Sequence, residues 1–259
     1  MLEKISEKLL LHHKRSFQTQ PGRNSSVPYR SRNELEIKAE ELLEWIRPSL
    51  LAEPCLTPVV EIAERLNKEF GVRIESRDLG YSPRGRKILG ACQFKPRAIF
   101  LDTTLDPSST RYRFTFAHEI GHLILHRKLR LNPAELDIAV NEIRDEPIHF
   151  YFGRRRARSP REWLEWQANV FASALLMPKA TLKTAVLEKQ QAMGTRRLGT
   201  IHVDNQPTNV VDYFEITNHL MAIYQVSRMA LHIRLKHLRI LEDRRRFNPQ
   251  HITTLLREE

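Results

Sequence analysis

Two histidines set four residues apart, His118 and His122, are the side chains of this 259-residue chain best suited to bind a metal ion. On an α-helix, residues at this spacing lie on one face a turn apart, so both imidazoles can reach the same ion. Nitrogen ligands at about 2 Å suit zinc. Glu119 lies at the edge of that face, where its carboxylate can reach a metal-activated water without binding the metal. The spacing therefore predicts zinc-dependent attack of water on a carbonyl, with Glu119 as the general base.

A third protein ligand must come from elsewhere, because a catalytic zinc site uses three protein ligands and keeps the fourth position open. His126 lies one turn beyond His122, too far along a straight helix to reach an ion held by the pair. A glycine bend could bring a later histidine back, but Leu125 and Lys128 occupy the positions that this route requires. We interpret His126 as a histidine at a helix C-terminus, favoured there by the helix dipole.

The next strongly patterned helix, 161–178, offers Glu165 as the third ligand. Glu165 shares a stripe with alanines three and seven residues later, so it can lie close against the first helix. The missing side chain of Gly121 would let another element approach that helix. Asn169, on the same stripe, can hydrogen-bond a ligating histidine from behind. Glu162 is the competing ligand, and we favour Glu165.

The oxyanion of a hydrolytic transition state needs a hydrogen-bond donor besides the metal. His149, Tyr151 and Tyr112 are the candidates that the sequence offers for this role. Zinc is the expected metal, and manganese is an alternative, because ligand sets of this kind bind several divalent ions.

The elements that must position these side chains begin with two helices. The first covers 34–47 and ends at Pro48. The second is expected to start at Thr57 and Pro58, with the threonine as its cap, and to stop at Gly71. Its apolar stripe is expected to consist of Val60, Ile62, Ala63 and Leu66.

Three short strands are expected next, at 72–75, 88–94 and 97–102, with the last two forming a hairpin around Lys95-Pro96. The helix at 111–126 carries the histidine pair. From about residue 161 the pattern is helical nearly to the C-terminus. We therefore predict an α+β fold with a small β-sheet, followed by a mostly helical C-terminal half.

Three blocks of the sequence resemble the ImmA/IrrE-type metallo-endopeptidases: FTFAHEIGHLILH (114–126), EWQANVFASALLMP (165–178) and QVSRMALHIRLKHL (225–238). The resemblance covers about 34–242. It implies a zincin-like domain with a thermolysin-like zinc site in which Glu165 is the third ligand. It also implies a bacterial or mobile-element protein that relieves repression by cleaving a helix-turn-helix repressor. Other members are toxin-like partners of such regulators, and the motifs do not choose between these roles.

A second function class is DNA binding. Residues 218–241 resemble a helix-turn-helix pair, with Ser227 as the cap of a second helix that carries Arg234 and Lys236. Apolar residues in the same helix imply burial, so we favour structural packing or substrate docking over DNA reading. Basic clusters, and the formal charge of +11, would attract any polyanion but define no docking geometry.

Composition bounds the remaining expectations. No run of about 18 apolar residues appears, and charges interrupt the apolar stretch at the N-terminus, so we expect neither a membrane span nor a secretory signal. Cys55 and Cys92 are spaced as neither a metal knuckle nor a disulfide framework. We expect a cytoplasmic protein with a flexible basic arm at 1–33, a peptidase domain at 34–242 and a tail at 243–259.

Overall fold

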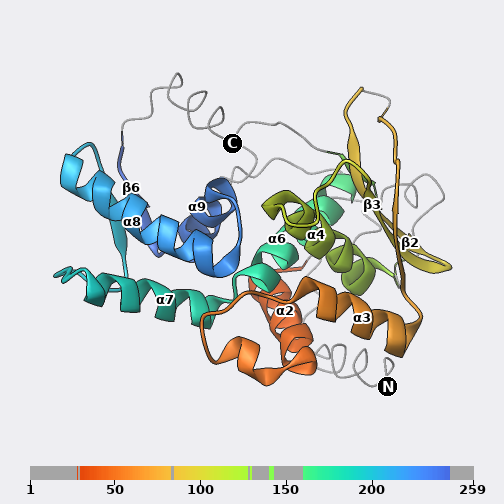
Figure 1. Ribbon diagram of the computed structural model, residues 1–259, viewed down its shortest axis with the longest axis horizontal. Coiled ribbons are helices and arrows are strands. Elements are labelled where there is room, and N and C mark those ends of the chain that lie inside the picture. The colour runs from red at the N-terminus through yellow and green to blue at the C-terminus, as the bar shows by residue number, and fades with distance from the viewer. Residues whose placement is uncertain are drawn as a thin grey trace. The chain divides into compact units, whose positions relative to one another are not determined.

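The computed structural model describes Pro28, residues 30–82, 85–127, Leu129, 140–142 and 160–245. The chain divides into two compact units, Met1–Thr181 and Leu182–Glu259, which are described separately below. The expected α+β fold is confirmed, and Figure 1 shows its order of elements. Most of the basic arm and most of the 131–160 segment lie outside the described residues.

The first unit begins with helix α2 (Arg32–Ile46), two residues earlier than expected. Its start is a reciprocal cap, because the hydroxyl of Ser31 accepts from the backbone N–H of Glu34 and the Glu34 carboxylate accepts from the N–H of Ser31. The helix ends before a short 3-10 turn, η1 (Pro48–Leu51), since proline cannot continue it.

Helix α3 (Val59–Phe70) ends at Gly71, as predicted, in the left-handed conformation that glycine adopts most readily. Two details of its prediction are wrong. Thr57 does not cap the helix, because its hydroxyl donates instead to the backbone carbonyl of Leu175, 2.8 Å away. Val60 is 62% exposed rather than part of the apolar stripe. The side chains that this helix buries are Val59, Ile62 and Leu66, which follow the helical repeat.

A four-stranded sheet in the order β1-β3-β2-β4 covers one side of the first unit. The expected hairpin is present, and β1 joins it in parallel to β3. The fourth strand was not predicted and pairs antiparallel to β2. The strands are β1 (Arg73–Arg77), β2 (Ile88–Phe94), β3 (Arg97–Asp102) and β4 (Val140–Glu142).

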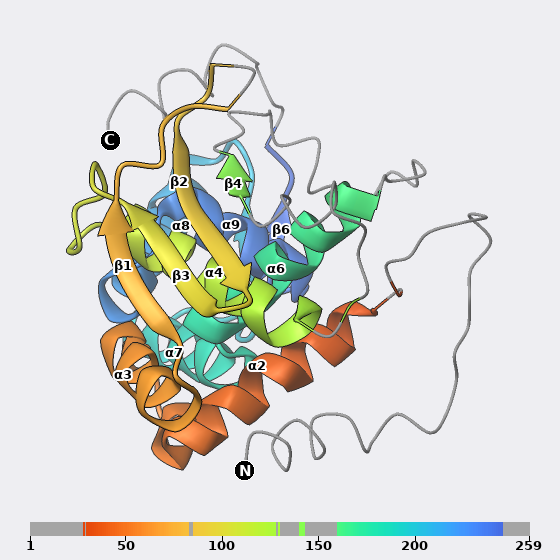
Figure 2. The same ribbon diagram turned by 90° about the vertical axis from the view of Figure 1, so that its right-hand side faces the viewer.

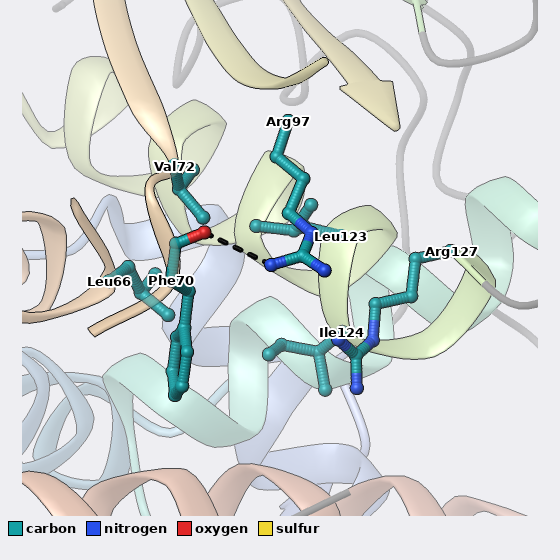
Figure 3. Close-up of a pocket in the computed structure, with 7 residues that line it drawn as sticks. All are labelled: Leu66, Phe70, Val72, Arg97, Leu123, Ile124 and Arg127. Atoms are coloured by element: carbon teal, nitrogen blue, oxygen red, sulfur yellow. Dashed lines mark hydrogen bonds between the residues drawn. The ribbon is translucent and has the colours of Figure 1, made fainter. Parts of the chain in front are cut away.

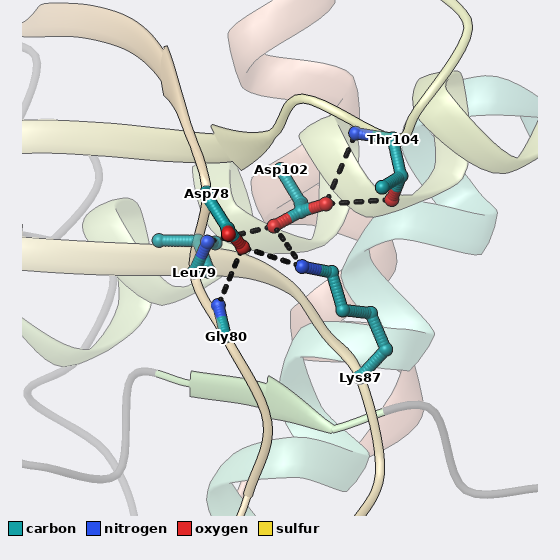
Figure 4. Close-up of polar contacts among 6 residues, drawn as sticks. All are labelled: Asp78, Leu79, Gly80, Lys87, Asp102 and Thr104. Carbon is teal, nitrogen blue, oxygen red and sulfur yellow. Dashed lines mark hydrogen bonds and ion pairs between the residues drawn. The ribbon is translucent and has the colours of Figure 1, made fainter.

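Asp102 at the end of β3 holds the loop that follows β1 (Figure 4). Its buried carboxylate accepts from the backbone N–H groups of Leu79 and Thr104 and from the Thr104 hydroxyl. Lys87 lies 3.0 Å from this carboxylate and 2.6 Å from that of Asp78. Burial alone would raise the pKa of Asp102, but these hydrogen bonds lower it, so the carboxylate stays ionised and ties two loops together.

Helices α4 (Thr110–His126) and α6 (Pro160–Leu176) pack against each other behind the sheet. Figure 2 shows the sheet in front of α4, which contacts β2 and β3, while α2 crosses below and contacts α6. The core between these layers is apolar and includes Phe116, Ile120 and Phe171, all at most 1% exposed. This packing fixes the position of one helix relative to the other.

A small apolar crevice lies where α3 meets α4 (Figure 3). The guanidinium of Arg97 closes one side and donates to the backbone carbonyl of Phe70, 3.0 Å away. Arg127 borders the other side. None of the predicted site residues that the structure describes lines this crevice, so we interpret it as a gap in the packing between elements rather than as part of the site.

The second unit contains most of helix α7 (Lys179–Ala192) and two helices separated by a short turn, α8 (Pro207–Tyr224) and α9 (Arg228–His237). Ser227 caps α9 as predicted. Two strands that the sequence reading missed, β5 (Ile201–Val203) and β6 (Leu241–Asp243), pair in parallel.

Asp243 in β6 organises a buried ionic cluster in the second unit. Arg245 lies 2.7 Å from its carboxylate, His232 3.6 Å and Lys236 3.9 Å. Burial of His232, with the nearby lysine, lowers its pKa to about 4, and the hydroxyl of Tyr213 lies 3.0 Å from its Nδ1. The cluster joins α8, α9 and β6 through charge and hydrogen bonding.

The two basic side chains of α9 that the less favoured DNA-binding alternative would use are not presented to solvent. Arg234 is 2% exposed, and Lys236 is mostly covered and lies beside Asp243. Phosphate contacts require accessible cations, so the burial of these side chains weighs against the DNA-binding alternative, as the apolar residues of the helix had led us to expect.

Among the described residues, no single helix is long and apolar enough to cross a membrane. The bent pair Arg161–Leu176 with Lys179–Ala192 meets that criterion by length and composition only.

Candidate metal centre

Helix α4 presents His118 and His122 side by side. The helix starts at a serine cap, where the hydroxyl of Ser109 accepts from the backbone N–H of Tyr112, and runs without a break through both histidines. Both imidazoles are buried, and their Nε2 atoms lie 2.9 Å apart. The four-residue spacing therefore directs two ligand nitrogens at one point.

Helix α6 brings Glu165 to the same point. One carboxylate oxygen, Oε2, lies 3.1 Å from Nε2 of His118, and the other lies 3.7 Å from Nε2 of His122. Ligand atoms of the three side chains all lie within 4.8 Å of one another, so the group could hold one metal ion. The competing Glu162 lies outside this group.

The charge states of these groups suit a cation. Burial alone would raise the pKa of Glu165, but the two histidines lower it well below its usual range. Burial lowers the pKa of His122, only partly opposed by Glu165. The group therefore offers one carboxylate together with imidazole nitrogens, which is the donor set of thermolysin-type zinc sites.

Gly121 allows the two helices to come this close. A β-carbon at that position would lie 3.3 Å from the backbone Cα and carbonyl oxygen of Ala168, and 3.1 Å from the ring of Phe171. Such distances are tighter than ordinary van der Waals contact, so a side chain there would push α6 away. Ala168 lies one turn after Glu165, which ties the helix spacing directly to the position of the carboxylate.

Asn169 lies behind the first histidine, with its Oδ1 2.9 Å from Nδ1 of His118. An amide oxygen can only accept, so Nδ1 of His118 carries the proton and Nε2 is bare. The bare nitrogen is the one that faces Glu165.

The sequence interpretation of His126 is confirmed for its position at the helix C-terminus and wrong for its charge. This residue does end α4, but it is 1% exposed, and burial lowers its pKa well below the usual range, so it is a neutral histidine rather than a cation at a helix dipole. Its Nδ1 lies 3.0 Å from Nδ1 of His122, and its Nε2 lies 3.3 Å from Oε1 of Gln167. Periodicity alone could have placed Gln167 on α6 but gave no reason to pair it with His126.

Glu119 is completely buried next to the histidine pair. Among the described residues, neither of its carboxylate oxygens has a hydrogen-bond partner. Burial and then the charge of Glu165 raise its pKa well above the usual range. Burying a carboxylate without hydrogen-bond partners lowers the stability of the fold, so a chain that keeps such a group is expected to use it in its function. A raised pKa is typical of a general base.

Strand β2 contributes a residue that the sequence reading missed. Gly90 lies against Glu119, and a β-carbon there would lie 2.6 Å from Oε1 of Glu119 and 2.7 Å from Cγ2 of Thr115. Only a residue without a side chain leaves room for the carboxylate. Cys92, on the same strand, is a buried free thiol whose pKa is raised by burial and by Glu119.

Of the candidates for an oxyanion donor, only Tyr112 lies among the described residues. Its ring packs 6.2 Å from that of Phe116, between ring centroids, and it precedes His118 by about 9 Å of helix. His149 and Tyr151 lie outside the described residues. The oxyanion donor therefore stays a prediction.

Comparison with known proteins places this site in a family. Residues 67–236, which include both ligand-bearing helices, match the IrrE N-terminal-like domain of a peptidase family. A solved transcriptional regulator from Mycobacterium tuberculosis aligns with 13% identity and a TM-score of 0.45, over 79% of this chain and 46% of that one. The chain thus spans less than half the length of that regulator. No curated protein matches. Because the family match covers more than half of the sequence, the chain belongs to the IrrE N-terminal-like peptidase family, which confirms the resemblance to ImmA/IrrE-type proteins.

Proposed function

We propose that this protein is a zinc-dependent endopeptidase. The observation that carries the proposal is the convergence of two histidine nitrogens and a carboxylate on one point, beside a buried glutamate whose carboxylate has no hydrogen-bond partner among the described residues. The two Nε2 atoms lie 2.9 Å apart, so if both are deprotonated their lone pairs repel unless a cation lies between them. A metal ion would relieve this repulsion and balance the negative charge of Glu165.

The roles of the side chains follow from their positions. His118, His122 and Glu165 would hold the metal, and Asn169 would keep His118 in the required tautomer. The bound metal would supply Lewis-acid activation of water and of the peptide carbonyl. Glu119 would accept a proton from the attacking water on one of its free oxygens and pass it to the leaving amine. Its raised pKa makes this carboxylate a stronger acceptor for the proton of the attacking water.

The substrate we propose is a helix-turn-helix repressor encoded beside this protein, cut once in a linker or an exposed helix. This part of the proposal rests on membership of the ImmA/IrrE-type family. The burial of Arg234 favours this reading over direct DNA binding by α9.

Metal analysis tests the ligands. We expect one zinc per chain purified without chelator, and loss of that zinc in His118→Ala, His122→Ala and Glu165→Ala. Two controls should keep it: Glu162→Ala, on the same helix as the third ligand, and a variant of the exposed His219 on α8. Full occupancy in a ligand variant would refute the assignment, and manganese instead of zinc would correct the metal.

A cleavage assay tests the reaction. Wild type, Glu119→Gln and chelator-treated protein are each incubated with the neighbouring repressor and followed by gel electrophoresis and mass spectrometry. Glu119→Gln should keep its zinc but cleave about 10²- to 10⁴-fold more slowly, because the base is gone while the shape is kept. Undiminished cleavage would remove Glu119 from the mechanism. No cleavage by any sample would refute the proposed substrate.

A further inference from the structure

A chain of hydrogen bonds leads from His122 to the main chain ahead of α2. Nδ1 of His122 meets Nδ1 of His126 at 3.0 Å, and Nε2 of His126 meets Oε1 of Gln167 at 3.3 Å. Nε2 of Gln167 then donates to the backbone carbonyl of Pro28 at 3.0 Å. His126 and Gln167 are at most 1% exposed, so solvent does not compete for these bonds.

The carbonyl of Pro28 determines which atom carries the proton in each of these hydrogen bonds. A backbone carbonyl can only accept, so the amide nitrogen of Gln167 must face Pro28 and the amide oxygen must face His126. Nε2 of His126 therefore carries the proton, and its Nδ1, in the neutral ring, is bare. A bare nitrogen can only accept, so Nδ1 of His122 must be the donor.

This assignment decides the state of the metal-facing atom. With its proton on Nδ1, His122 has a bare Nε2, which is the atom that faces His118 and Glu165. The opposite tautomer would place a proton where the metal must bind. His122 can bind a metal through Nε2 only when its proton is on Nδ1, and the hydrogen bonds that lead from the carbonyl of Pro28 place it there.

We infer that His126 and Gln167 are positioning residues that hold His122 in its ligating tautomer and orientation, with the Pro28 carbonyl as their anchor. The inference deepens the proposed function and rests on it, because it concerns the readiness of the same metal site. It also gives the backbone of Pro28 a role, since two side chains connect its carbonyl to a metal ligand.

Matched variants separate positioning from packing. His126→Phe keeps the buried ring but removes both nitrogens, whereas His126→Asn keeps an acceptor near the position of Nδ1. Gln167→Met keeps the length of the side chain and removes both of its polar atoms. The outer partners of metal-binding histidines typically contribute 10- to 100-fold to metal affinity. We expect losses of that size in His126→Phe, smaller losses in Gln167→Met, and recovery to within a few-fold of wild type in His126→Asn.

Zinc affinity is measured by chelator competition, cobalt coordination by visible absorption, and folding by thermal unfolding of the chelator-treated proteins. Wild type that binds neither zinc nor manganese refutes the proposed function itself. Wild type with zinc, together with unchanged affinity and cobalt spectrum in His126→Phe, refutes the positioning role alone. If His126→Phe does not fold, the ¹⁵N spectrum of the zinc-loaded wild type decides. A proton on Nε2 of His126 and on Nδ1 of His122 supports the inference, and a proton on Nδ1 of His126 overturns it.

Discussion

Replacing Gly90 by alanine should disable the proposed catalytic base while leaving the metal ligands in place. The new β-carbon would lie 2.6 Å from Oε1 and 3.0 Å from Cγ of Glu119. Carbon and oxygen atoms in contact need roughly 3.3 Å or more, so the carboxylate must move by roughly 0.7 Å. Misplacement of a reacting group by about 1 Å can lower a rate by about 10²-fold, and we expect a loss between 10- and 100-fold in repressor cleavage.

The same substitution should also cost stability, because the β-carbon meets Cγ2 of Thr115 at 2.7 Å. Overpacking of this kind costs about 1–3 kcal/mol in the free energy of unfolding. Thr115→Ser removes the methyl group, so the double variant Gly90→Ala/Thr115→Ser should recover stability without recovering cleavage. This control separates a damaged fold from a displaced Glu119.

The assay combines three measurements on each variant: zinc content, thermal unfolding and the rate of repressor cleavage. We expect zinc content equal to wild type, because the three proposed ligands come from α4 and α6 rather than from β2. Full cleavage activity in Gly90→Ala would refute the argument that this glycine makes room for Glu119. Loss of zinc would show that β2 positions the ligands as well.

Two further predictions concern stability. Thr57→Val should lower the free energy of unfolding by about 1–3 kcal/mol, because it removes the buried hydrogen bond to the Leu175 carbonyl without changing side-chain shape. Denaturant unfolding measures this change, and a value near zero would contradict the prediction. The pKa of His232 is lowered to about 4 from 6.5, so between these pH values the unfolded chain binds a proton that the folded chain does not. The contribution of neutral His232 to the free energy of unfolding is therefore fully present above pH 6.5 and falls by up to about 3 kcal/mol as the pH drops to 4. His232→Asn should remove this part of the pH dependence. Parallel curves of stability against pH for the two proteins would refute the assignment.

Local periodicity was enough to predict most of the elements around the site. The two histidines share a helix face because the four-residue spacing is a property of the helix itself. Glu165 was selected by the same argument on α6, where its stripe of small residues predicted close packing. Caps and stops such as Ser227 and Gly71 were readable because their backbone chemistry depends on immediate neighbours.

Tertiary contacts decided the rest, because they join residues far apart in the sequence. Thr57 was predicted to cap a helix, but its hydroxyl donates to a carbonyl on α6. His126 was interpreted as a helix C-terminal histidine favoured by the dipole, but packing buries it against Gln167. Strands β5 and β6 are three residues each, too short for an alternating pattern, and exist because they pair with each other. Gly90 carries no local signal at all, since its role appears only when β2 lies against Glu119. The sequence by itself determined which side chains share a helix face, whereas only the tertiary structure determined which buried polar atoms face each other, and those contacts set the tautomers and charges at the site.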